Sequence, residues 1–218
     1  MTKPLLLAGM AILSISVAAP PAPNFQHHME SYYININENG NRPIGPLPLY
    51  PKAIPNTYIA KYDATWFGEI SRIFARNTDA VIRDITTGRI FNMRRTFGTN
   101  HADVEPLTRE DAAIMYDIWG GHSWERRAVV VYVGNYVFAG SLTNFPHAGV
   151  DNAPSLATVN NRSGGYGRGL NFDAVKGNGV DGHMCLHFAG SLIHGSNRSN
   201  AAHQQRVAEA VEYIKANY

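Results

Sequence analysis

The 218-residue chain has a single cysteine, Cys185, so an intrachain disulfide framework is excluded. Charged residues make up only 17% of the chain, and 19 Lys and Arg against 17 Asp and Glu leave a formal net charge of +2. So small a net charge provides no electrostatic footprint for nucleic acid and no strong field for a membrane surface. Hydrophobic residues, at 44%, indicate instead a chain that can bury a globular core.

The N-terminal segment has the organisation of a secretory signal peptide. Lys3 precedes the apolar run Leu5–Val17, which is too short to cross a bilayer as a mature helix. We therefore predict that residues 1–19 are a signal peptide and that the protein is secreted, periplasmic or associated with the cell wall, with no membrane contact after cleavage. Prolines punctuate the next segment, so we interpret 20–64 as a Pro-rich arm or linker and 65–218 as the catalytic domain.

The patterning of the remaining chain predicts mostly strands. Residues rich in β-branched side chains form two expected hairpins, 80–85 with 89–95 and 128–133 with 136–142, and a further strand is expected over 182–188. Helical spacing and capping residues predict helices over 66–75, 109–119 and 200–218, and 148–182 is expected to be a long loop. The predicted fold class is α+β, mostly β: a mixed or antiparallel sheet domain with two or three peripheral helices.

The densest functional signal surrounds the cysteine. On a strand, alternate side chains share a face, so His183, Cys185 and His187 would lie together, opposite the apolar residues between them. A thiol between imidazoles is a plausible activated nucleophile, because imidazole can take its proton. The alternative is a structural free cysteine beside two incidental histidines.

Three further residues are candidates for the same site. His147 lies at a strand end before a flexible loop, where a general base is well placed, although an exposed loop histidine is the simpler interpretation. Arg95 and Arg127 are strand-end arginines that could bind a substrate carboxylate, and a solvated face is the alternative for both.

A second polar row precedes the helix expected at 109–119. On an extended segment His101, Asp103 and Glu105 would share a face. His and Asp two residues apart can bind zinc, or Asp can orient an imidazole. A turn with solvated carboxylates explains the row equally well.

The chain resembles the L,D-transpeptidase catalytic domain of bacterial cell-wall enzymes over roughly 80–195. The resemblance rests on Gly182–His187, which is similar to the nucleophile motif of that family, and on Pro146–Gly149, which is similar to its upstream histidine element. Met184 replaces the family's Gly, and His187 stands where Arg or Asn is expected. The 38 positions from the histidine element to the cysteine imply an inserted loop.

The resemblance implies a mainly β fold, no cofactor and a thioester mechanism on peptidoglycan stem peptides. Cys185 would attack a peptide carbonyl and His147 would be the base. Backbone N–H groups beside the cysteine would form the oxyanion hole, and His183 would orient its neighbours.

Two alternatives remain at this stage. The segment 186–188 is similar to the terminal histidine strand of zinc peptidoglycan peptidases, which implies zinc held by His101, Asp103 and His187 with one open position. The other alternative is a non-catalytic wall-binding module whose polar rows are only hydrogen-bond networks.

Overall fold

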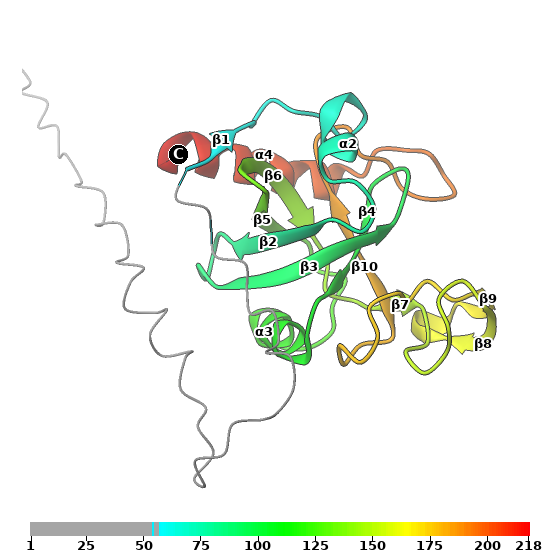
Figure 1. Ribbon diagram of the computed structural model, residues 1–218. Helices are drawn as coiled ribbons and strands as arrows, with labels where there is room; N and C mark the ends of the chain where they lie inside the picture. The colour runs from blue at the N-terminus through cyan, green and yellow to red at the C-terminus, as the bar shows by residue number, and fades with distance from the viewer. Residues whose placement is uncertain (1–53, 55–56) are drawn as a thin grey trace, which may run out of the picture. The chain divides into compact units, whose positions relative to one another are not determined.

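The computed structural model describes residues 54 and 57–218 (Figure 1). The predicted signal peptide, 1–19, and most of the predicted arm, 20–64, lie outside these residues. Strand β1 (Ile59–Ala60) runs parallel to a strand of the main sheet, so the folded part includes the end of the predicted arm. Among the described residues, no helix is both long and apolar enough to span a bilayer.

Six antiparallel strands form a closed barrel. In spatial order they are β6 (Tyr136–Leu142), β5 (Arg127–Val133), β2 (Asp79–Asp84), β3 (Ile90–Phe97), β4 (Ala102–Pro106) and β10 (Gly182–His187). The last strand also pairs with the first, through Leu186 against Leu142 and His187 against Ser141, which closes the ring. Closure leaves no free edge between these strands. The predicted fold class, α+β with mostly antiparallel strands, is confirmed.

Local sequence explains the two hairpins, which form as predicted. In the β5–β6 hairpin, Gly134 has φ 57°, the left-handed conformation that a tight two-residue turn requires and glycine adopts without strain. The β2–β3 hairpin has its turn tied by Asp84, which accepts hydrogen bonds from the backbone and hydroxyl of Thr87. Each hairpin therefore contains the residues that set its own register.

The barrel interior forms the main hydrophobic core, and its two ends are closed by helical segments. Helix α3 (Arg109–Trp119) contributes the buried Met115 and Trp119, and begins at Thr108, whose hydroxyl accepts from the Asp111 backbone N–H. At the other end lie η1 (Trp66–Ile70) and α2 (Ser71–Ile73). Figure 1 shows α2 and α3 on opposite sides of the strands.

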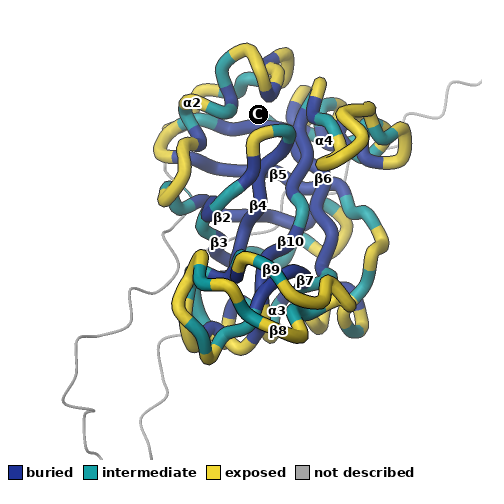
Figure 2. Tube along the Cα trace, turned by 90° about the vertical axis from the view of Figure 1, so that its right-hand side faces the viewer, coloured by how far each residue is buried: buried dark blue, intermediate teal, exposed yellow. Residues whose placement is uncertain are grey.

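A second core lies on the outer face of β5 and β6. Helix α4 (Ala201–Asn217) buries Val207, Ala210 and Ile214 against Val130 and Ala139. The helix packs along one apolar stripe, as its sequence spacing predicts. Figure 2 shows the result: the strands of the barrel are mostly buried, and the exposed residues lie mainly in the connections and on the outer faces of the helices.

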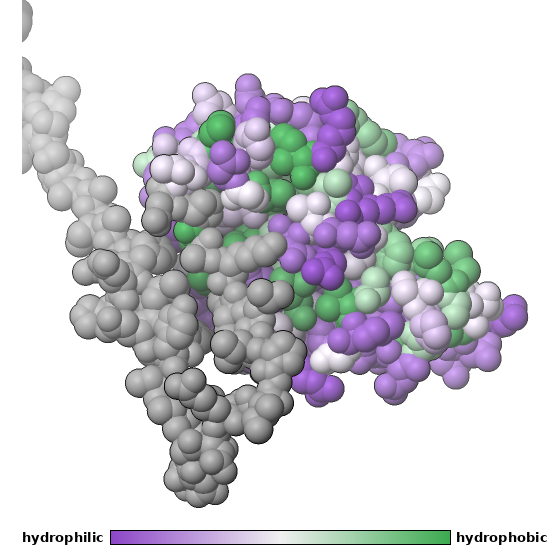
Figure 3. Space-filling view, in the orientation of Figure 1, coloured by the Kyte–Doolittle hydropathy of each residue, from purple (hydrophilic) through white to green (hydrophobic). Residues whose placement is uncertain are grey.

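The segment predicted as one long loop contains secondary structure. It holds β7 (His147–Ala148), β8 (Thr158–Arg162), the turn η2 (Ser163–Gly165) and β9 (Gly167–Leu170), with β8 and β9 paired as a separate hairpin. Few apolar residues alternate there, so the pattern did not reveal these strands. Figure 3 shows hydrophobic surface at this hairpin, where Leu156 and Leu170 are exposed.

Candidate functional site

Strand β10 places the predicted polar row on one face. Met184 and Leu186 are fully buried in the barrel core, so His183, Cys185 and His187 point to the opposite side. The two histidines are buried, whereas Cys185 is only partly buried. The cysteine is therefore the least buried member of the row.

His147 contacts the thiol although 38 residues separate them. Strand β7 pairs with the start of β10, with His147 opposite His183. The His147 Nε2 atom lies 3.8 Å from Cys185 Sγ, and its Nδ1 atom lies 3.0 Å from the Phe145 carbonyl oxygen. A carbonyl only accepts, so Nδ1 carries the ring proton and the Nε2 lone pair faces the thiol. The structure therefore brings together His147 and Cys185, two of the predicted site residues.

Burial keeps both partners uncharged in the resting site. Together with the adjacent His183, it lowers the pKa of His147 to about 4. Burial also raises the pKa of the Cys185 thiol, as does the nearby Asp103 carboxylate. The resting pair is thus a thiol beside a neutral imidazole. Such a pair acts by general-base transfer of the proton during attack.

His183 links this pair to Asp103. Its Nδ1 atom donates to the Phe172 carbonyl oxygen at 3.1 Å, which turns Nε2 toward Asp103 Oδ2 at 3.7 Å. The rings of His183 and His147 are 4.3 Å apart. A continuous polar row therefore runs from the cysteine to the carboxylate. His183 lies where it can orient His147, as the resemblance implies.

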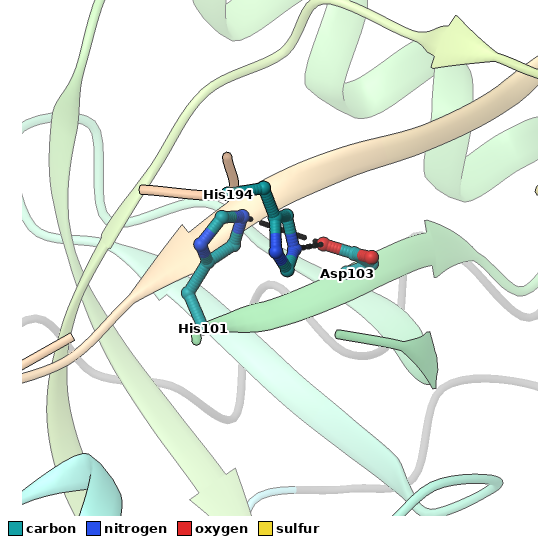
Figure 4. Close-up of side chains that lie close together, drawn as sticks. All are labelled: His101, Asp103 and His194. Carbon is teal, nitrogen blue, oxygen red and sulfur yellow. Dashed lines mark hydrogen bonds and ion pairs between the residues drawn. The ribbon is translucent and has the colours of Figure 1, made fainter. Parts of the chain in front are cut away.

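Asp103 is the centre of a second cluster, shown in Figure 4. Its Oδ1 atom lies 3.3 Å from His101 Nε2 and 3.2 Å from His194 Nε2. Burial by itself would raise the pKa of Asp103, but the hydrogen bond to His194 and the neighbouring His183 and His101 hold it below its usual value. His101 and Asp103 thus meet as predicted.

The third member of this cluster is His194, a residue that the sequence pattern did not single out. It lies in the connection between β10 and α4, and its position next to β4 depends on the path of that connection. The signal that could have found it is a histidine in the polar Gly, Ser and Asn segment directly after the cysteine strand. The residue predicted for this place, His187, is not in the set of converging ligand atoms.

His187 occupies a buried stack of rings instead. Its imidazole lies between those of His101 and His203, with ring centroids 4.1 Å and 3.8 Å away. Burial strongly lowers its pKa, and its Nδ1 atom has no hydrogen-bond partner among the described residues. The stack fixes the plane of the His101 ring.

Arg95 is committed to the fold, which corrects its prediction as a substrate-binding residue. Its buried guanidinium donates to the backbone carbonyls of Ser71, Phe74, Phe97 and Gly98. Those four carbonyls belong to α2 and the residue that follows it, and to the end of β3 and the residue that follows it. With its donors directed to them, Arg95 stabilises these two segments.

Arg127 is likewise engaged inside the protein. Its guanidinium binds the fully buried Asp84 carboxylate through Nε at 2.8 Å and Nη2 at 3.1 Å, and it stacks over Trp119. Asp84 therefore occupies the bidentate position in which Arg127 would bind the carboxylate of a substrate. The prediction of Arg127 as a substrate-binding residue is therefore also corrected.

Two exposed aromatic residues flank His147 and were not predicted. The rings of Trp124 and Tyr166 lie 5.0 Å and 5.2 Å from the His147 ring, and Trp124 also stacks on Phe145. Both side chains are partly exposed next to the His147 imidazole. Exposed aromatic rings beside a reactive centre are suited to hold a ligand against it.

Comparison of the chain with protein-family models, curated proteins and solved structures produced no match. Function is therefore inferred from the chemistry of the site. The pair of Cys185 and His147 can carry out acyl transfer without a cofactor. The cluster of His101, Asp103 and His194 has the donor atoms of a metal site.

Proposed function

We propose that the protein is an exported peptidoglycan-modifying enzyme that acts on stem peptides through a Cys185 thioester, as an L,D-transpeptidase-like enzyme or a peptidase. The observation that carries this proposal is the position of His147. Its Nδ1 proton is held by the Phe145 carbonyl, so the Nε2 lone pair is directed at Sγ, 3.8 Å away. The identity of the substrate rests on the resemblance in the cysteine and histidine motifs.

The chemistry begins with transfer of the thiol proton to His147 Nε2 while Sγ attacks a peptide carbonyl carbon. The tetrahedral intermediate collapses with cleavage of the C–N bond, and the imidazolium returns its proton to the leaving amine. The thioester is then attacked by water or by the amine of a second stem, with His147 taking a proton from the attacking group. The thiol is regenerated when the C–S bond breaks.

The surrounding residues support this sequence of steps. His183 packs against the ring of His147, and Asp103 lies beyond it. Trp124 and Tyr166 provide apolar surface on which a stem peptide or its sugar can rest.

The test measures cleavage and exchange of purified stem peptides by mass spectrometry. We expect Cys185→Ala to abolish both reactions and the covalent acyl-protein adduct. His147→Ala should lower the rate by about 10²- to 10⁴-fold, the usual contribution of a general base. The matched control is His122→Ala, which removes an exposed histidine outside the row and should leave the rate unchanged.

Two results would overturn the proposal. Activity that survives Cys185→Ala but is lost with a chelator would favour the zinc peptidase. A wild-type protein that binds peptidoglycan without converting any stem peptide, and without an alkylatable thiol, would favour the wall-binding module.

A further inference from the structure

We propose that His101, Asp103 and His194 bind one divalent cation of the zinc class, because their ligand atoms converge around a buried imidazole nitrogen that has no hydrogen-bond partner. The His101 side chain is 2% exposed. Its Nε2 atom is buried and makes no hydrogen bond within the described chain, although it lies 3.3 Å from Asp103 Oδ1. The site does not include Cys185 or His147, and Asp103 connects it to them through His183.

The position of the ring proton on His101 explains why its Nε2 atom has no hydrogen-bond partner in the described chain. Its Nδ1 atom lies 2.7 Å from the Leu192 carbonyl oxygen and must donate to it. In the neutral ring, Nε2 then carries a lone pair and faces a carboxylate oxygen, which also carries lone pairs. The two atoms are 3.3 Å apart. A cation between them would relieve this opposition.

Two of the three distances between ligand atoms fit a tetrahedral ion. With zinc–nitrogen and zinc–oxygen bonds of about 2.0–2.2 Å, adjacent ligand atoms of a tetrahedron lie about 3.3 Å apart. Asp103 Oδ1 is 3.3 Å from His101 Nε2 and 3.2 Å from His194 Nε2. All three ligand atoms lie within 4.8 Å of one another. Three protein ligands leave a fourth position for water.

The outer contacts match those of metal-binding histidines. Such histidines donate their second ring nitrogen to a carbonyl or carboxylate, as His101 does to Leu192. The His187 ring stacks on His101 and fixes its plane. His194 lies in a connection that is tied to Asn100, which binds the Ile193 carbonyl and accepts from the Leu192 backbone N–H. These contacts hold the ligands in place before an ion arrives.

The donor set selects the class of ion. Two imidazoles and one carboxylate suit zinc and neighbouring transition metals, whereas calcium and magnesium prefer oxygen ligands throughout. The His194 side chain is 42% exposed, which provides an entry path. Bound there, the cation would tie the connection after β10 to β4 and neutralise the carboxylate next to the cysteine strand.

The test uses the full chain, prepared without a histidine tag, stripped with chelator and then titrated with zinc. We expect one zinc per chain and a higher Tm when zinc is present. His194→Ala should lower zinc affinity by more than about 100-fold, beyond the usual effect of altering an outer-shell residue. His194 is partly exposed, so this variant should fold, as its circular dichroism would show. His122→Ala, the matched control, should bind zinc as the wild type does.

The outcomes separate this proposal from the proposed function. Cys185→Ala should bind zinc normally while losing activity. No stoichiometric zinc in the wild type, or equal binding by His194→Ala, would overturn the metal site and leave the cysteine mechanism intact. Stoichiometric zinc together with full activity in Cys185→Ala would instead support the site and overturn the cysteine mechanism.

Discussion

Glu105 provides a sharp test of the electrostatics next to the site. This β4 carboxylate is fully buried and accepts hydrogen bonds from the backbone N–H groups of Ala174 and Val175, at 2.8–3.0 Å. Burial nevertheless raises its pKa from 4.5 to about 7, despite those bonds. The perturbation we choose is Glu105→Gln, which keeps the shape and one acceptor oxygen but cannot ionise.

The sign follows from the raised pKa of the folded state. The proton on Glu105 stabilises the fold below pH 4.5, and this contribution is lost as the pH rises through about 7. A shift of about 2.5 pKa units, at 1.36 kcal/mol each, corresponds to about 3 kcal/mol. Relative to Glu105→Gln, the wild type should therefore lose about 3 kcal/mol of unfolding free energy between about pH 4 and pH 8.5.

The assay is urea unfolding of both proteins across this pH range. Subtracting the two curves cancels the titration of the buried histidines, which both proteins share. Glu110→Gln, at an exposed position of α3, is the matched control and should run parallel to the wild type. If the difference between wild type and Glu105→Gln stays constant with pH, burial does not control the ionisation of Glu105 and the reasoning is refuted.

Two further predictions concern the packing behind the site. Phe188→Ala should lower the unfolding free energy by about 3–5 kcal/mol, because Phe188 is fully buried and stacks on Trp66; Phe67→Ala, at an exposed position, should change it by less than about 0.5 kcal/mol in chemical denaturation. Gly182→Ala should lower the unfolding free energy by about 1–3 kcal/mol through backbone strain at φ 92°, and by more because the added Cβ would collide with the His147 carbonyl oxygen. It should also slow the alkylation of Cys185. The control is Gly88→Ala, where the added Cβ has open space; if Gly182→Ala lowers the unfolding free energy no more than Gly88→Ala does, the predicted collision is wrong.

The sequence alone determined the elements whose signals are local. The β5–β6 hairpin depends on Gly134 and the β-branched residues on either side, and α3 depends on the Thr108 cap. The common face of His183 and Cys185 follows from strand alternation, which needs no knowledge of other strands. Strand alternation therefore predicted which side chains share a face, but it did not predict that His187 would be buried between the rings of His101 and His203.

Tertiary structure alone decided which of these residues meet. The Cys185 thiol lies beside His147, 38 residues away in the sequence, because β7 pairs with β10. His194 contacts Asp103 because the connection after β10 folds back to β4. Strand order also decides the partner of Arg127, because its strand lies next to the strand that carries Asp84. Side-chain partners of this kind depend on strand order and barrel closure, which are set by the balance of burial over the whole chain, whereas turns and caps depend on a few adjacent residues.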